Sequence, residues 1–228
     1  MPRPRHPVPG AGHISRKVYV MSVSLYFGLP GCGKTTTLTE IAYNAINKKK
    51  SPYKHVYGNV HLALSGYTYI DNECIGNFLL EDCLILIDEA TLYADSRDFK
   101  NFSGNRLNFF MLHRHYRADI ILFVQKWDAV DIKIRTITDN VYYVYKPLLI
   151  GHWFSYIYRI PYGIDFVSQK HDGRRYGDII QGYGKPSFMT KLFAHKLYRP
   201  KFYKYFDSWE IKELPPLPDK YKPYPASS

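Results

Sequence analysis

The sequence predicts an α/β fold: a mainly parallel central sheet flanked by helices, with a small β-rich C-terminal extension. Three observations support this prediction. Two short runs, Cys83–Ile87 and Ile120–Val124, are continuously apolar, which is typical of parallel strands covered on both faces. The segments between apolar runs are long enough for helical crossovers. A third strand-like segment, Val23–Phe27, is followed by a glycine-rich turn and then by a segment whose apolar residues recur at helical spacing.

The remaining elements follow in chain order. Helical spacing begins near Lys34, and Lys48–Lys50 stands where cations complement the negative end of a helix. Further strands are expected at residues 55–60, 67–70 and, more weakly, 141–145, and a helix at residues 107–117. After Lys146, aromatic and apolar residues between turn signals predict a β-hairpin or meander.

Composition limits the class of protein. The 228 residues are 46% hydrophobic and 17% aromatic, which excludes a disordered chain and is enough for one sizeable core. The odd number of cysteines, three, excludes a disulfide scaffold, and their spacing argues against structural zinc. We expect four regions: a flexible basic arm (1–21), a core (22–146), a basic aromatic β-rich extension (147–207) and a Pro-rich tail (208–228).

The net charge of +11 is unevenly placed, because the core is neutral overall and both flanks are basic. No run approaches the roughly 20 apolar residues of a membrane span, and no signal peptide is evident. We therefore expect a protein on the cytoplasmic side of the cell that makes it.

One motif predicts phosphate binding. Gly28–Thr35 (G-L-P-G-C-G-K-T) matches the P-loop pattern between a predicted strand and a predicted helix. Glycines let backbone N–H groups surround phosphate oxygens, the Lys34 ammonium reaches the outer phosphates, and the Thr35 hydroxyl is a ligand for Mg²⁺. The predicted residues for binding ATP are Gly28, Pro30, Gly31, Cys32, Gly33, Lys34, Thr35 and Thr36. The alternative is a glycine-rich turn with a solvated lysine.

A second element supports this site. The apolar strand at residues 83–87 ends in Asp88 and Glu89. Asp88 is expected at the Mg²⁺ site, and Glu89 is expected to orient and deprotonate the attacking water. Alternatively, Glu89 caps a following helix or is solvated.

Two further side chains are candidates for catalysis. Gln125 follows a central strand and would sense the γ-phosphate or hold the water, unless it is an ordinary loop amide. Arg135, ahead of Arg114 and Arg117, is a candidate finger for a neighbour's γ-phosphate. The alternative for Arg135 is an ion pair with Asp131, four residues earlier.

The basic extension mixes tyrosines with lysines and arginines, a composition typical of surfaces that bind single-stranded nucleic acid. Attraction to anionic lipid, or a solvated surface around a small aromatic core, remains an alternative.

Four segments resemble the zonular occludens toxin family, which includes the gene I assembly proteins of filamentous phages. They are G-L-P-G-C-G-K-T-T, L-I-L-I-D-E-A, H-R-H-Y-R-A-D-I-I-L-F-V-Q and D-I-K-I-R, and the resemblance covers Ser22 to Val144. It implies an FtsK/HerA-like P-loop ATPase, often a ring, in which Gly28–Thr36 bind nucleotide, Asp88 and Glu89 form the acidic pair and Gln125 is the sensor. Filamentous-phage members usually carry a transmembrane helix after the ATPase domain, so we expect here a soluble or truncated form, or a membrane partner in trans.

The sequence thus predicts an Mg-ATP-dependent ATPase in virion morphogenesis, acting in assembly, extrusion or DNA translocation. The expected partners are further copies in a ring such as a hexamer, single- or double-stranded DNA bound by the basic tail, and other phage assembly proteins. The expected location is the host cytoplasm, with peripheral contact at the inner membrane as a further option. The alternatives are a small-molecule P-loop kinase and a nucleotide-binding scaffold without turnover.

Overall fold

The structure, a computed structural model, describes residues 21–90, 104–146, 156–162, 164–167, 176–179 and 194–207. The P-loop side of the chain contains β1 (Val23–Phe27), α1 (Lys34–Asn47), β2 (His55–Gly58), β3 (Tyr67–Tyr69), η1 (Asn72–Cys74) and β4 (Cys83–Ile87). The middle contains α3 (Gly104–Leu112), β5 (Ala118–Val124), α4 (Ile132–Ile137) and β6 (Asn140–Tyr145). The last part contains β7 (Tyr156–Tyr162), β8 (Ile164–Val167), β9 (Tyr176–Ile179), β10 (His195–Tyr198), η2 (Arg199–Lys201) and η3 (Tyr203–Tyr205).

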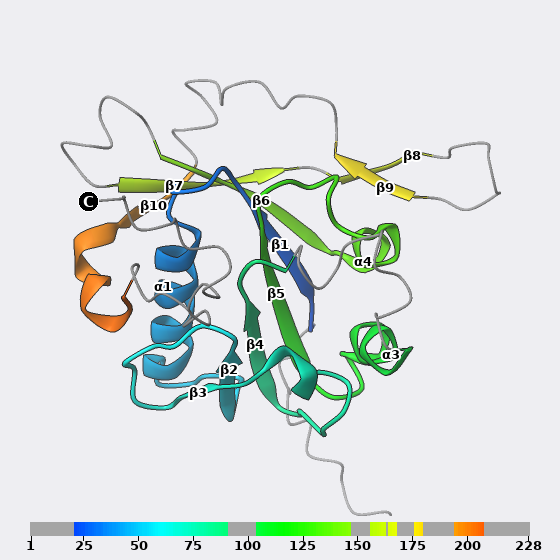
Figure 1. The fold of residues 1–228 in the computed structure, drawn as a ribbon, viewed down its shortest axis with the longest axis horizontal. Helices are drawn as coiled ribbons and strands as arrows, with labels where there is room; N and C mark the ends of the chain where they lie inside the picture. Colours follow the sequence, from blue (N-terminus) through cyan, green and yellow to red (C-terminus); the bar gives the residue numbers. More distant parts are fainter. Residues whose placement is uncertain are drawn as a thin grey trace, which may run out of the picture.

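The described strands form one large sheet and a separate β8–β9 hairpin (Figure 1). The order of the large sheet is β10-β7-β6-β1-β5-β4-β2-β3. Every neighbouring pair from β6 to β3 is parallel, whereas β7 runs antiparallel to β6 and β10 antiparallel to β7. This arrangement confirms the predicted α/β fold with a mainly parallel sheet and a β-rich extension.

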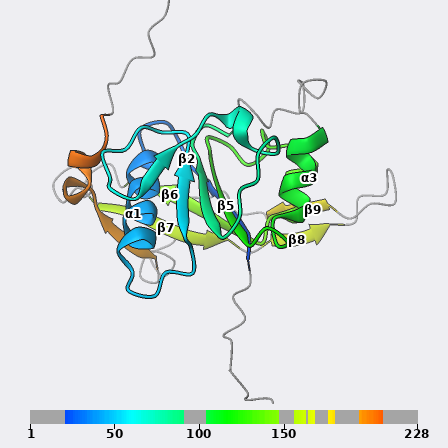
Figure 2. The same cartoon turned by 90° about the horizontal axis from the view of Figure 1, so that it is seen from below.

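Helices cover both faces of the sheet, with α1 on one side and α3 and α4 on the other (Figures 1 and 2). The alternation of β1 explains the two cores, because successive side chains of a strand point to opposite faces. Leu25 and Phe27 pack in the core that contains Phe109 of α3, while Tyr26 packs in the core that contains Leu38 of α1. Both faces of the central sheet are therefore covered, as the continuously apolar strands predict.

Sequence-predicted boundaries differ most at α3. β4 has the predicted bounds, whereas the helix expected at residues 107–117 runs from Gly104 to Leu112. A turn follows the helix, and Arg117 adopts a left-handed φ of 53° there. The Arg117 guanidinium bonds the Asp82 carboxylate, which stabilises a backbone conformation that arginine rarely adopts.

The basic extension joins the core rather than standing apart from it. β7 pairs with β6, and β10 pairs with β7, so both strands extend the central sheet. The predicted hairpin corresponds to β8 and β9, which pair antiparallel. The boundaries at residues 21, 146 and 207 stay predictions.

Among the residues described, no helix combines the length and the apolar character needed to cross a bilayer.

Candidate nucleotide-binding site

The P-loop lies at the carboxyl end of β1, beside the end of β5. The backbone N–H of Gly28 donates to Val124 O at 3.2 Å. Gly31 and Gly33 have φ values of 73° and 101°, a left-handed region that favours glycine. Gly33 is also the N-cap of α1, so the loop leads directly into the positive end of that helix.

Lys34, the first residue of α1, folds back over the loop. Its ammonium donates to the carbonyl oxygens of Gly28 at 2.8 Å and Leu29 at 3.2 Å. These neutral acceptors hold the cation at the mouth of the loop, where a phosphate oxygen would make a stronger, charge-assisted bond.

The predicted metal residues meet directly. The Thr35 hydroxyl donates to Asp88 Oδ2 at 2.8 Å, although the two residues are 53 positions apart. Burial raises the pKa of Asp88, and the Thr35 hydrogen bond only partly offsets that effect. A desolvated carboxylate beside a hydroxyl is a hard-oxygen pair of the kind that holds Mg²⁺. The residues present therefore fit a magnesium ion.

Asn59, which follows β2, is a positioning residue that the sequence analysis missed. The Asp88 backbone N–H donates to Asn59 Oδ1 at 2.7 Å, and Asn59 Nδ2 donates to the Asp88 carbonyl oxygen at 2.9 Å. This two-point contact fixes the Asp88 backbone. A polar residue at the end of a parallel strand is the available signal, but the strand expected at residues 55–60 includes Asn59, whereas β2 ends at Gly58.

Glu89 and Gln125 lie at the same edge of the sheet. Glu89 is exposed, has a φ of 51°, and its N–H donates to Asp88 Oδ1 at 2.9 Å. Gln125 is exposed directly after β5. The parallel register aligns Phe27 with Val124 and Ile87 with Leu122, so the residues that follow these strands emerge together. Ligands of open α/β sheets bind at this edge.

The other predicted loop residues differ in exposure. Pro30 is exposed, Thr36 is buried, and Cys32 is buried with a Sγ that a Cβ on Gly28 would approach to 2.7 Å. Burial raises the pKa of the Cys32 thiol, so its reactive thiolate is disfavoured. Cys32 thus packs beneath the loop.

The predicted arginine fingers lie elsewhere. Arg135 is on α4, whose Ile134 packs in the core opposite α1, and its guanidinium lies 5.8 Å from the Trp127 ring centroid. The Asp131 side chain accepts from Lys133 N–H at 2.7 Å and so caps α4. No Asp131–Arg135 ion pair occurs among the described residues. Arg114 pairs with Asp139, and Arg117 with Asp82. A role for Arg135 in a neighbouring subunit stays a prediction.

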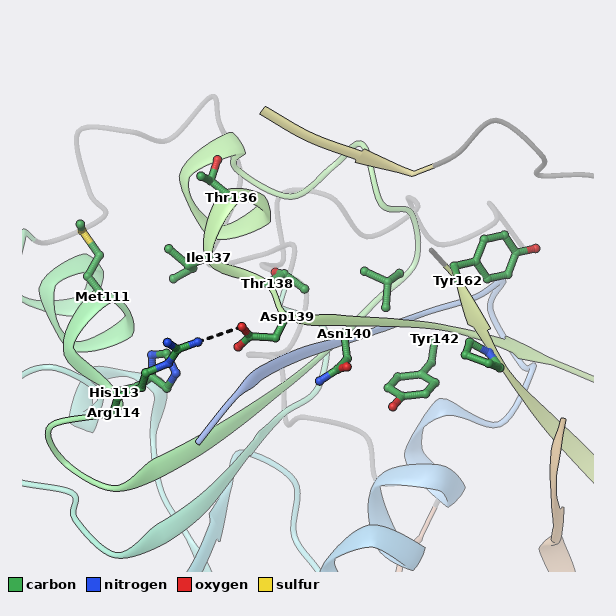
Figure 3. A pocket seen from close by; sticks show the side chains of 12 residues that line it. Met111, His113, Arg114, Thr136, Ile137, Thr138, Asp139, Asn140, Tyr142 and Tyr162 are labelled. Atoms are coloured by element: carbon green, nitrogen blue, oxygen red, sulfur yellow. Dashed lines mark hydrogen bonds and ion pairs between the residues drawn. The ribbon is translucent and has the colours of Figure 1, made fainter. Parts of the chain in front are cut away.

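A separate hollow of about 660 Å³ lies between the turn after α3, the end of α4 and strands β6 and β7 (Figure 3). The 2.9 Å ion pair between Arg114 and Asp139 lines it, next to His113. His113 is buried, and its Nδ1 lies 2.7 Å from Phe110 O. None of the P-loop residues lines this hollow.

Two residues of the extension lie against the P-loop, and sequence analysis found neither. A Cβ on Gly33 would overlap Ile157 of β7 and would lie 3.8 Å from Arg199 Nε of η2. No local pattern marks a contact between residues so far apart in the chain. The extension therefore contributes to the surroundings of the nucleotide site.

Several basic side chains of the extension lie over rings of the same region or of α1. Lys196 lies over Tyr158 at 5.9 Å, Lys201 over Tyr43 at 5.5 Å and Lys204 over Tyr205 at 4.9 Å. Tyr198 and Tyr203 keep 49% and 44% of their surface exposed. Part of the basic aromatic surface thus packs on the core, and part remains accessible.

The matched family is described as zonular occludens toxin (Zot), and its model covers residues 67–173. Residues 67–173 of this chain are thus similar to the Zot family. The matched range contains Asp88, Glu89, Gln125 and Arg135, and it begins after the P-loop.

Solved structures extend the comparison to the fold. The N-terminal domain of Zot from Neisseria meningitidis is similar at a TM-score of 0.50 and 16% identity, over 83% of this chain and 100% of that one. This similarity shows the fold alone. The DNA-packaging ATPase B204 of Sulfolobus turreted icosahedral virus has a TM-score of 0.43 and 13% identity, over 61% of this chain and 92% of its own.

A KaiC-like protein from Pyrococcus horikoshii matches at a TM-score of 0.43 and 12% identity, over 68% of this chain and 84% of its own. None of the curated proteins matches this chain.

Proposed function

We propose that this protein is an Mg-ATP-dependent ATPase of the Zot type that acts in virion morphogenesis, in assembly, extrusion or DNA translocation. The observation that carries the proposal is the 2.8 Å contact between the Thr35 hydroxyl of the P-loop and Asp88, with Glu89 next in the chain. In this proposal, one edge of the sheet carries the loop that binds phosphate, the Thr35 and Asp88 oxygens for a divalent cation, and the Glu89 carboxylate.

Each residue has a distinct part in the proposed reaction. The backbone N–H groups of the loop and the Lys34 ammonium bind the phosphates, and Lys34 exchanges its carbonyl partners for phosphate oxygens. Thr35 and Asp88 would hold Mg²⁺, which supplies positive charge for the phosphate oxygens when bound.

Hydrolysis needs an activated water. Glu89 accepts a proton from water as the water oxygen bonds the γ-phosphorus, and the bond from that phosphorus to the bridging oxygen breaks. ADP and inorganic phosphate leave. Gln125, at the same edge, orients the water or contacts the γ-phosphate. Arg135 would act in trans on the γ-phosphate of a neighbouring subunit.

Glu89→Gln tests this assignment. The amide cannot take a proton, so we expect turnover to fall by about 10²–10³-fold while ATP affinity stays within a factor of about two. Phosphate release and equilibrium ATP binding are the two measurements. Glu81→Gln is the matched control, because Glu81 is an exposed carboxylate that pairs with Arg117 away from the loop.

The outcomes separate the candidate functions. Wild-type turnover in Glu89→Gln would remove the proposed role of this carboxylate. Transfer of the γ-phosphate to an added hydroxyl compound, rather than to water, would favour a small-molecule kinase. ATP binding without hydrolysis, in the presence of DNA and membranes, would favour a nucleotide-binding scaffold.

We further propose a homo-oligomeric ring, such as a hexamer, that contacts DNA through the basic extension and works with other phage assembly proteins. Exposed Tyr198 and Tyr203 beside exposed Lys196 and Lys204 support DNA contact, because rings stack on bases and cations bind phosphates. We propose the host cytoplasm as the location, with peripheral contact at the inner membrane. The same cations would attract anionic lipid.

A further inference from the structure

Arg199 stands where the C-terminal extension meets the P-loop. β10 ends at Tyr198, and η2 begins at Arg199. The Arg199 Nε lies 3.8 Å from the position that a Cβ on Gly33 would occupy. Gly33 is the N-cap of α1, and its neighbour Lys34 carries the ammonium of the motif. Two cations from distant parts of the chain thus flank one helix N-terminus.

The charge of Arg199 is not balanced by an acid. Within the described residues, no carboxylate lies within ion-pair distance of its guanidinium, and its Nε is buried without a hydrogen-bond partner. The Cζ of the guanidinium lies 5.5 Å from the centroid of the Tyr203 ring. A cation beside Lys34 and the positive end of a helix is unfavourable until an anion joins them.

The second arginine at this interface, Arg159, does have a carboxylate partner. Arg159 of β7 pairs with Glu40 of α1 at 2.7 Å, and both side chains are largely buried. Glu40 also lies 3.3 Å from His195 Nε2 on β10. These contacts fix the extension on the P-loop helix and hold η2 at the loop. Arg159 is therefore an anchor, while Arg199 is the cation left for a ligand.

We propose that Arg199 binds the phosphate chain of the nucleotide in cis, as a specificity-determining residue supplied by the extension. This inference rests on the proposed nucleotide site. A guanidinium presents paired N–H donors that match phosphate oxygens. The extension then completes the site as well as enlarging the sheet, so nucleotide binding and the position of β10 are linked.

Competition binding tests the assignment on the full chain. ADP with Mg²⁺ and inorganic pyrophosphate are the probes, because pyrophosphate reports phosphate contacts without a base. Arg199→Gln is expected to weaken both by about tenfold or more, as for loss of a charge-assisted hydrogen bond. Arg199→Lys keeps the positive charge but lacks the paired donors of a guanidinium. Its affinities for both probes are expected to lie between those of the wild type and Arg199→Gln.

Lys201→Gln is the matched control, because it removes one cation from the same short helix, where the ammonium lies over Tyr43. Its affinities should equal those of the wild type, and thermal unfolding without nucleotide should show that all variants fold. Unchanged pyrophosphate affinity in Arg199→Gln, or an equal loss in Lys201→Gln, would overturn the assignment. Failure of the wild type to bind ADP would instead contradict the proposed function itself.

Discussion

At the scale of single residues, Asp88 is the group whose protonation links the fold to the site. Because burial raises its pKa, the folded protein favours the neutral acid more than the unfolded chain does. From its ordinary pKa up to the raised value, the folded state therefore loses stability as the pH rises. A bound divalent cation would reverse that loss by stabilising the carboxylate.

Asp88→Asn should separate stability from binding. Without nucleotide, we expect the variant to unfold at a higher temperature than the wild type at pH 7, because it removes a carboxyl group whose charged form is disfavoured in the folded protein. The difference should shrink as the pH falls and wild-type Asp88 takes up its proton. The Mg²⁺-dependent part of ADP binding should weaken by more than about tenfold, since a ligand is lost.

Thermal unfolding between pH 4 and pH 8 and ADP titrations with and without Mg²⁺ measure these effects. Asp128→Asn is the control, since Asp128 is exposed in the loop after β5. An Asp88→Asn protein that is less stable than the wild type at pH 7 and keeps its full Mg²⁺ dependence would argue against the magnesium site.

At the scale of secondary-structure elements, the ion pair between Glu40 and Arg159 joins α1 to β7. Glu40 is 8% exposed, so a Glu40→Gln substitution leaves a nearly buried guanidinium without its counter-charge. We expect the free energy of unfolding to fall by about 3 kcal/mol. Amide exchange should accelerate most in β7 and β10, because these strands lose their attachment to the helix.

Lys54→Met is the control for Glu40→Gln, because Lys54 pairs with Asp82 while keeping 72% of its side chain exposed. An exposed pair contributes about 0–1 kcal/mol. Chemical denaturation followed by fluorescence gives both values. Equal losses of unfolding free energy in Glu40→Gln and Lys54→Met would show that the Glu40–Arg159 pair does not anchor the extension.

The elements also show what a sequence can predict. The P-loop and β4 were predicted because each is one contiguous segment whose residue types are set by local chemistry. The end of α3 is not predicted, because Arg117 adopts a left-handed φ in the turn that follows the helix, and its contact with Asp82, 35 residues away in the chain, helps to stabilise that conformation. Arg199 and Ile157 were missed for a related reason, because only the packing of β7 and β10 brings them to Gly33.

At the scale of the whole molecule, the excess charge lies in the flanks of a neutral core. The described part of the basic extension is attached to the nucleotide site through Glu40, Arg159 and the contact at Gly33. If that surface holds DNA, a change in its position upon nucleotide binding offers a physical link between ATP and cargo.

Sedimentation tests this proposal. With a slowly hydrolysed ATP analogue, we expect a species of about six subunits that carries a short labelled DNA at low salt. The DNA should dissociate as salt rises, because phosphate contacts release counterions. A monomer under every condition would contradict the ring, and DNA binding that is insensitive to salt would contradict a contact made by the basic extension.

Phosphate release from Mg-ATP by the wild type and by Lys34→Ala tests the central claim most directly. The Lys34 ammonium lies at the mouth of the loop on the carbonyls of Gly28 and Leu29, and its loss should lower turnover by at least about 10²-fold. Lys54→Ala, which removes an exposed lysine far from the loop, should retain the wild-type rate. We predict rapid phosphate release by the wild type and by Lys54→Ala, but not by Lys34→Ala. Release by Lys34→Ala at the wild-type rate would contradict the proposed ATPase site.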